Sequence, residues 1–165
     1  MMQNNIPINI ALNKVLILKD WKDALLSSFP EETSPFLNNP DPFVNPIGAM
    51  FPKMLETLYD QITGEMNDDN ISAALDDYIK LRAVQDSDPS LAFDFLMYLK
   101  KMLRSREFGS KLYETGCGNV NILEDRIDYI VLKSFDMYMK CREKIYTLRI
   151  NEFKKRAFRV LENIQ

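Results

Sequence analysis

Histidine is absent from this sequence of 165 residues. Its absence removes the commonest general base and zinc ligand, the proximal ligand of most haem proteins, and the base of Ser-His and Cys-His catalytic arrangements. Glycine is scarce as well, and neither a Gly-rich phosphate loop nor a dinucleotide fingerprint occurs. We therefore expect no enzyme, no cofactor and no metal site. Haem ligation through Cys, Met or Tyr is the alternative that remains open.

Cysteine is almost as scarce, and no long apolar run is present. Cys117 and Cys141 are far apart and no secretory signal pattern opens the chain, so we expect reduced thiols. Residues 6–18 form an apolar stretch, but polar residues and Lys14 interrupt it, which predicts that the chain has no transmembrane segment. The expected location is the cytoplasm, and no nucleic-acid partner is expected.

The residues that are present favour helices. Hydrophobic residues make up 46% of the chain, and no block of alternating Val, Ile and Thr predicts a strand. The sequence predicts an all-α fold in which residues 1–165 form a single helical bundle. The expected helices cover residues 10–29, 46–64, 71–85, 89–107 and 122–164. Residues 30–45 are expected to form a loop that Phe36, Leu37 and Phe43 anchor to the core. Pro52 predicts a kink, or a helix that begins near Phe51.

A short polar corner joins two of these helices within the stretch Lys80–Leu103. Asp88 stands where an N-cap carboxylate would accept from the next helix, and Pro89 follows at the first helical position. Asn45 and Pro46 repeat this arrangement. The apolar side chains before the corner are Leu75, Ile79 and Ala83, and those after it are Leu91, Phe95, Tyr98 and Met102, with Ala92, Leu96, Leu99 and Leu103 beside them. The pattern predicts two packed helices.

Two separated motifs stand out in the chain: LRAVQD at residues 81–86, followed by Pro89, Ser90 and Ala92, and DPFVNPIG at residues 41–48. Together they resemble the N-terminal domain of the RsbT co-antagonist family, the RsbR/RsbRD proteins of bacterial stress signalling. The resemblance covers most of the chain from about Trp21 to Arg104.

This resemblance implies a globin-like domain without haem, placed before a phosphorylatable STAS domain in large signalling assemblies. The present chain would be a stand-alone version of that domain, without a STAS domain. It departs from the family pattern at Ser87, Asp88 and Leu91, where members usually carry an aromatic residue, a Thr and a Gln. The capping box that the Gln would complete is therefore missing, although Asp88 could cap alone.

The last predicted helix, residues 122–164, contains no Gly or Pro and would begin with a capping box formed by Asn121 and Glu124. At about 1.5 Å per residue it would extend roughly 60 Å, whereas a compact domain of this size is about 40 Å across. We therefore expect it to overhang. The residues expected to pack in the domain are Ile127, Ile130, Ser134, Met137 and Cys141. The residues expected to form a helix-pairing seam are Tyr146, Ile150, Phe153, Ala157, Val160 and Ile164.

Charge divides along the chain in the same way. Residues 1–100 carry 7 basic and 15 acidic side chains, a net charge of −8, whereas residues 101–165 carry 14 basic and 9 acidic side chains, a net charge of +5. Arg142 and Arg149 are the basic residues that we place at the interface. The basic helix could face an acidic partner, nucleic acid or anionic lipid. It could equally be a solvated surface, or pair with the acidic body of another subunit.

Arg82, Gln85 and Asp86 are the candidate ligand or partner contacts at the corner. Arg82 can reach Asp86 four residues on and Gln85 can cap a neighbouring backbone group, so a purely structural role also explains them. Cys117 lies between glycines just ahead of a predicted helix start, which makes it the candidate redox thiol. Cys141 falls on an apolar stripe and is expected to pack.

Taken together, these features predict a non-catalytic sensory or regulatory interaction domain in bacterial stress or redox signalling. It would act through homodimerisation, or through a signalling or redox-complex partner, using the long C-terminal helix. One alternative is a sensor of an apolar small molecule, with a haem-free pocket lined by Met and Phe. Another is an accessory subunit of a redox complex.

Overall fold

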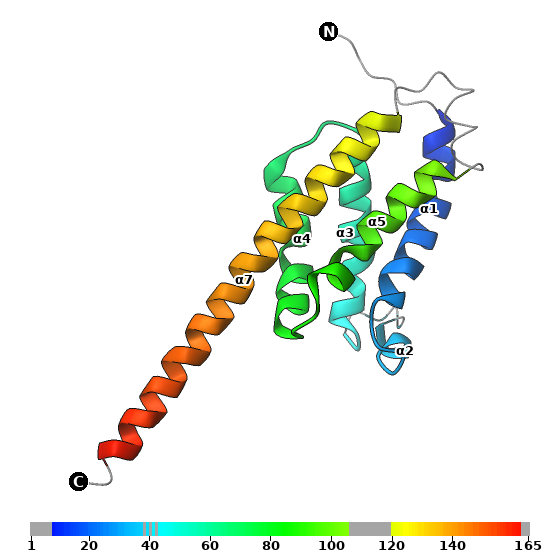
Figure 1. The fold of residues 1–165 in the computed structure, drawn as a ribbon. Coiled ribbons are helices and arrows are strands. Elements are labelled where there is room, and N and C mark those ends of the chain that lie inside the picture. The colour runs from blue at the N-terminus through cyan, green and yellow to red at the C-terminus, as the bar shows by residue number, and fades with distance from the viewer. Residues whose placement is uncertain (1–7, 38, 40, 42, 106–119, 163–165) are drawn as a thin grey trace.

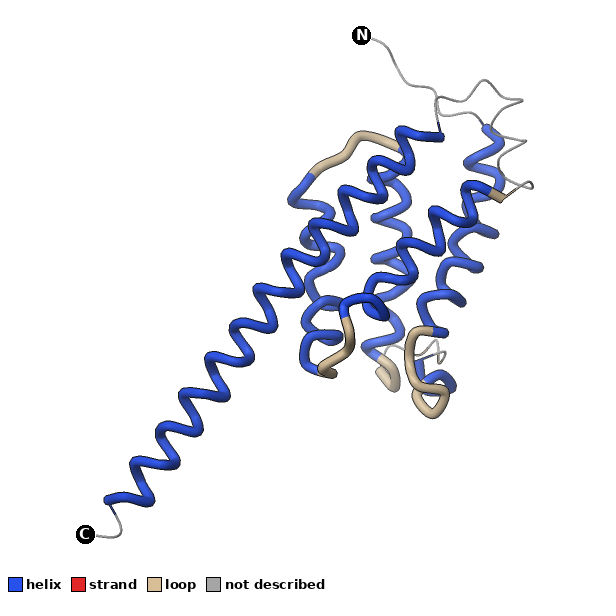
Figure 2. The backbone as a smooth tube through the Cα atoms, viewed as in Figure 1, coloured by secondary structure: helices blue, strands red, loops and turns tan. Residues whose placement is uncertain are grey.

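The described residues of the chain form helices joined by loops, with no strand among them (Figure 2). The computed structural model describes residues 8–37, 39, 41, 43–105 and 120–162. The helices are α1 (Ile8–Ser27), α2 (Ser34–Leu37), α3 (Pro46–Thr63), α4 (Asp68–Val84), α5 (Pro89–Arg104) and α7 (Val120–Glu162). The predicted all-α bundle with a long C-terminal helix is confirmed.

One hydrophobic core holds α1, α3, α4, α5 and the first part of α7 together (Figure 1). Aromatic rings run through its centre: Tyr78 lies edge-on to Phe95 with ring centroids 5.3 Å apart, and Trp21 stacks on Phe95 at 6.0 Å. The polar atoms of these rings are satisfied by α5, because Trp21 Nε1 donates to the Phe95 carbonyl and the Tyr78 hydroxyl donates to the Ala92 carbonyl. Trp21 of α1 and Tyr78 of α4 are therefore both anchored to α5.

Capping explains where α3 begins and ends. The Asn45 side chain accepts from the Gly48 N–H at 2.7 Å, as predicted, while its Nδ2 donates to the Leu37 carbonyl at 2.9 Å. Gly64 closes the helix at the predicted position. A start near Phe51 is wrong, because the helix runs continuously from Pro46 through Pro52.

The predicted start of α4 and the predicted cap of α5 need correction. Asn67 caps α4 by accepting from the Asn70 N–H at 3.0 Å, so the helix begins three residues before the predicted Ile71. Asp88 occupies the N-cap position of α5, but its carboxylate makes no capping hydrogen bond, and that prediction is wrong. Pro89 at the first helical position is confirmed. It sets the start of α5 without help from the Asp88 side chain.

Some apolar residues lie elsewhere than predicted. Helix α1 ends two residues early, at Ser27, and α2 forms inside the predicted loop. Leu37 packs into the core as expected, whereas Phe36 and Phe43 are exposed. Helix α5 is rotated relative to the expected stripe, so that Leu91 and Tyr98 are exposed while Phe93 joins Ala92, Leu96 and Leu99 in the interior. Spacing identified the helix, and packing against α1 and α7 selected its buried face.

Candidate interaction site on the long C-terminal helix

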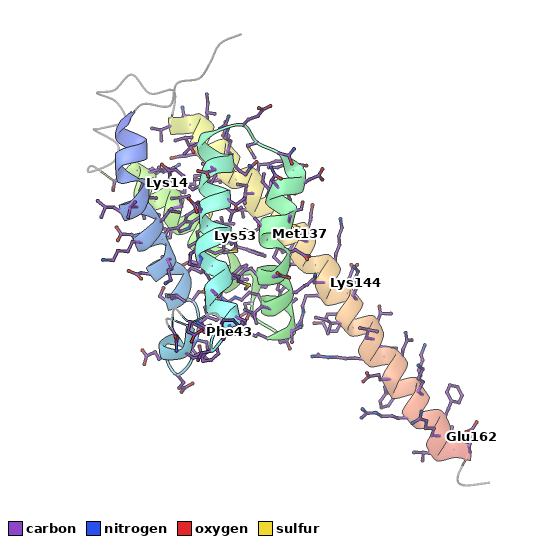
Figure 3. All side chains as sticks on the ribbon, turned by 180° about the vertical axis from the view of Figure 1, so that it is seen from behind. Lys14, Phe43, Lys53, Met137, Lys144 and Glu162 are labelled. Carbon is purple, nitrogen blue, oxygen red and sulfur yellow. The ribbon has the colours of Figure 1, made fainter. Side chains whose placement is uncertain are left out.

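Helix α7 consists of a packed first part and a free second part. Its buried residues are Ile127, Ile130, Ser134, Tyr138 and Arg142. Ile145 is the last residue that packs against the core, and every residue from Tyr146 to Glu162 is exposed. We call these last 17 residues of the helix the rod; they extend about 26 Å at 1.5 Å per residue. Figure 1 shows α7 leaving the bundle, and Figure 3 shows side chains on all sides of the helix between the labelled residues Lys144 and Glu162.

Polar contacts fix the packed part of α7 to the helices beside it. Lys100 pairs with Asp128 at 2.7 Å and Arg104 pairs with Glu124 at 2.5 Å. Arg126 donates to the Ile62 and Gly64 carbonyls at 2.7 Å each, which satisfies the carboxyl end of α3. The predicted capping box is wrong, because Glu124 is used by Arg104 and Asn121 already lies inside the helix.

The amino end of α4 is held by the same helix. The Tyr129 hydroxyl donates to Asp68 at 2.7 Å, and Lys133 pairs with that carboxylate at 3.1 Å. The hydrogen bond from Tyr129 lowers the pKa of the Asp68 carboxyl below its ordinary value, and Lys133 acts in the same direction. The packed part of α7, which ends at Ile145, is therefore held to the other helices. We call this part of α7 together with helices α1 to α5 the body.

The rod leaves the body at a junction formed by Ala83, Asp86, Ser87, Tyr138 and Arg142. The Arg142 guanidinium donates to the Ala83 carbonyl at 2.9 Å, forms an ion pair with Asp86, and donates to the Tyr146 hydroxyl at 2.5 Å. The Tyr138 hydroxyl donates to the Ser87 carbonyl. The corner between α4 and α5 therefore contacts α7 immediately before the rod begins.

The backbone at the end of α4 explains why Asp86 faces α7. The Ser87 N–H bonds to the Arg82 carbonyl at 3.3 Å and the Asp86 N–H to the Ala83 carbonyl at 3.4 Å, the two bonds of a Schellman motif. Asp86 takes the left-handed position of this motif, with φ of 58°, where glycine is the usual residue. Glycine would fit the backbone more easily, but only the carboxylate can pair with Arg142.

The predicted pair between Arg82 and Asp86 is wrong. The left-handed turn removes Asp86 from the helix, so the four-residue spacing no longer brings the two side chains together. Arg82 is only 2% exposed and donates to the Ser28 carbonyl at 3.2 Å and the Leu91 carbonyl at 3.1 Å. Its guanidinium lies 4.4 Å from the centroid of the Phe29 ring. Arg82 thus ties α1 and α5 to α4, and in the described part of the chain no carboxylate pairs with it.

The other candidate contacts at the corner also have structural positions. Gln85 is the C-cap of α4, where its backbone N–H donates to the Leu81 carbonyl, and its side chain is exposed. Of the three predicted contact residues, the structure brings only Asp86 to the junction with α7. Cys117, the candidate redox thiol, lies outside the described residues. Cys141 packs partly buried against the core, as predicted.

The predicted seam lies on the exposed part of α7. Its described residues, Tyr146, Ile150, Phe153, Ala157 and Val160, are all exposed, and so is Arg149. Ile164 lies outside the described residues. Arg142 does not belong to this surface, because its side chain is buried in the junction of its own chain. Sequence analysis missed that role because spacing along one helix does not reveal a partner on another.

Two further apolar residues extend the seam toward the start of α7. Leu132 and Met139 are exposed on the packed part of the helix, 14 and seven residues before Tyr146. Continuing the seven-residue spacing backwards from Tyr146 would have identified them. The exposed apolar surface is therefore longer than the rod.

Two other features are absent from the described ranges. No group of three or more Cys, Asp or Glu side chains there could hold a metal ion. None of the helices in those ranges is both long and apolar enough to cross a membrane. Among the methionines, Met54 is buried, Met50, Met102 and Met137 pack partly buried around the core, and Met97 and Met139 are exposed.

The arrangement therefore leaves an exposed apolar surface on α7, connected through the junction to the rest of the bundle. Comparison of the chain with protein-family models, with curated proteins and with solved structures finds no match.

Proposed function

We propose that this protein is a non-catalytic regulatory domain that works by association through the exposed seam of α7. The observation that carries this proposal is the rod, in which 17 consecutive helical residues have no covering element while five apolar side chains share one face. Burying such side chains is favourable by roughly 25 cal/mol per Å² of apolar surface. A helix of this length is marginal in water without packing, so a partner would stabilise it.

The junction gives this association a route to the rest of the molecule. Arg142 contacts Asp86 and Ala83 on one side and Tyr146, the first seam residue, on the other. A change at the corner between α4 and α5 would therefore alter the start of the seam, and a change in helix pairing would act on the corner. The motifs that resemble the RsbT co-antagonist family lie partly at this corner, which supports a role in stress signalling.

Self-association is the form of this proposal that can be measured directly. The test compares sedimentation of the full-length protein with that of two matched variants, Phe153→Ser and Phe158→Ser. Both rings are exposed on the rod, at 74% and 66%, but only Phe153 lies on the seam. Phe153→Ser should raise the dimer dissociation constant at least about tenfold, because two apolar rings lose their contact, whereas Phe158→Ser should leave it nearly unchanged.

A chain ending at Arg142 provides the second arm of this test. It lacks the rod and should sediment as a monomer at concentrations where the full-length protein is dimeric. Identical monomeric behaviour of the two chains would refute association through the rod. The apolar-ligand sensor and the redox-complex subunit stay predictions, since no feature of the described residues favours either of them.

A further inference from the structure

A line of apolar side chains runs along the outer face of α7 with a spacing of seven residues. The line consists of Leu132, Met139, Tyr146, Phe153 and Val160, whose exposed fractions are 67%, 40%, 48%, 74% and 59%. Over 28 residues it spans about 42 Å. A seven-residue apolar repeat sustained over four heptads is typical of a helix that pairs with another helix. In heptad notation these residues occupy position d.

The a positions beside this line change character along the helix. In the packed part of α7 they are Asp136 and Glu143, both exposed and acidic, whereas in the rod they are Ile150 and Ala157. The rod also carries basic residues on both flanks of the seam, at Arg149, Lys154 and Arg156. The a positions are therefore acidic on the body and apolar on the rod, while basic residues flank the line on both halves, with Lys133 and Lys140 on the body.

From this change at the a positions we infer that a second copy of this chain occupies the surface, with the two α7 helices antiparallel. The inference rests on the proposed self-association and adds its geometry. A parallel pair would place Asp136 against its own counterpart and Glu143 against its own counterpart at buried a positions. Like charges at those positions oppose pairing. The antiparallel pair instead sets Asp136 and Glu143 of each helix beside the rod of the other, whose flanks are basic.

The heptad limits the antiparallel pair to registers that differ by seven residues, because only these set the d positions of one helix beside a positions of the other. The proposed register sets Tyr146 beside Ile150 and Met139 beside Ala157. In this register Glu143 lies beside Phe153 of the second copy, and Lys154 is the next residue along. Each dimer contains this pair of opposite charges twice, which offsets the cost of an acidic residue in the seam.

The size of the body agrees with this register. The rod of one copy, residues 146–162, would cover residues 134–150 of the other. The outer face of α7 is exposed along that stretch. The body ends on α7 at Ile145, which lies opposite position 151 of the second copy. The two bodies are then separated along the helix by six residues, about 9 Å, and do not collide. One additional heptad of overlap would remove this clearance.

Disulfide cross-linking of full-length protein tests the orientation. In a background with Cys117→Ser and Cys141→Ser, a chain carrying Met139→Cys is mixed with a chain carrying Ala157→Cys and oxidised. Antiparallel pairing brings these positions side by side and should give the mixed disulfide, whereas parallel pairing separates them by about 27 Å along the axis. Phe153→Cys alone is the converse probe: it joins to itself in a parallel dimer and lies about 15 Å from its counterpart in the antiparallel one.

Charge exchange tests the register. Glu143→Lys and Lys154→Glu should each raise the dimer dissociation constant about fivefold, because each places like charges together twice per dimer. The protein with both substitutions should return to within about twofold of the unmodified value. Glu143 and Lys154 are 11 residues apart in one chain, so restoration requires contact between copies.

The results of cross-linking and charge exchange distinguish the antiparallel pair from the more general proposal of association through the rod. A dimer that forms the mixed disulfide and recovers with both charges exchanged supports the antiparallel pair. A dimer that cross-links through Phe153→Cys alone, or in which the two charge substitutions add instead of compensating, overturns the antiparallel pair and leaves association through the rod standing. A full-length protein that stays monomeric overturns both.

Discussion

Arg142 and Arg149 lie one heptad apart on α7, yet the structure gives them different roles, and substitution of each by alanine should separate those roles. Arg142 is buried and donates to the Ala83 carbonyl at 2.9 Å, whereas Arg149 is exposed on the rod. Arg142→Ala removes one charged hydrogen bond to a buried carbonyl and an ion pair to the exposed Asp86, together with the bond to the Tyr146 hydroxyl. The first two contribute roughly 1.5–3 kcal/mol and up to about 1 kcal/mol respectively.

The expected cost is at the low end of that total, because the Ala83 carbonyl keeps its bond from the Asp86 N–H. Arg142→Ala should therefore lower the free energy of unfolding by about 2 kcal/mol, and Arg149→Ala by less than about 0.5 kcal/mol. Urea unfolding measures both, at a protein concentration low enough to keep the chain monomeric, since association would add its own stability.

Hydrogen exchange locates the loss. In Arg142→Ala the amides around Tyr138 and Tyr146 should exchange faster, because the junction no longer holds α7 to the corner, while those around Ile130 should keep their protection. Equal losses of stability in the Arg142 and Arg149 variants, or a loss of protection spread over the whole bundle, would refute the assignment of Arg142 to a local junction.

Three further predictions follow from other polar contacts between the helices. Arg82→Met should lower the free energy of unfolding by about 3 kcal/mol in urea titration, because the Ser28 and Leu91 carbonyls lose their donor; a variant as stable as the unmodified protein would show that Arg82 is dispensable. Asn45→Ala should cost about 2 kcal/mol in the same assay, since the cap of α3 and the bond to the Leu37 carbonyl disappear together; a loss below about 0.5 kcal/mol would contradict that role. Tyr129→Phe should raise the pKa of Asp68 toward 3.8 in an NMR titration. Because the folded pKa is lowered, the stabilisation is present above pH 3.8 and disappears as the pH falls through the folded value, so an unchanged Asp68 titration in Tyr129→Phe would disprove the link.

Local sequence rules located the helices because the signals for their ends are local. Asn45 with Pro46 and the stop at Gly64 are contained within α3 and its flanks, and both were predicted correctly. The overhang of α7 was also predictable, because a long segment without Gly or Pro cannot fit inside a domain of this size.

The partners of charged residues were not predictable in the same way. Arg82 and Asp86 stand at a spacing that pairs them on a continuous helix, but α4 ends at Val84 and Asp86 itself takes a left-handed conformation. Arg82 then bonds to a carbonyl 54 positions away, at Ser28, and Asp86 pairs with Arg142. Such contacts depend on how helices pack, and no local pattern in one sequence encodes that packing.

The spacing of the outer line on α7 argues for a helix as its partner, independently of charge. A straight α-helix has 3.6 residues per turn, so a line with a period of 3.5 drifts by about 20° per heptad. From Leu132 to Val160 the drift amounts to roughly 80°, which would carry one end of the line away from any flat surface that contacts the other end. A second helix that winds around the first with a left-handed twist follows the line throughout. The residues that pack α7 into its own body, Ile127, Ile130, Ser134, Tyr138 and Arg142, step by three and four and end where the body ends, whereas the outer line continues onto the rod. The two faces of α7 are therefore suited to different partners: the inner face to a short bundle and the outer face to one long helix.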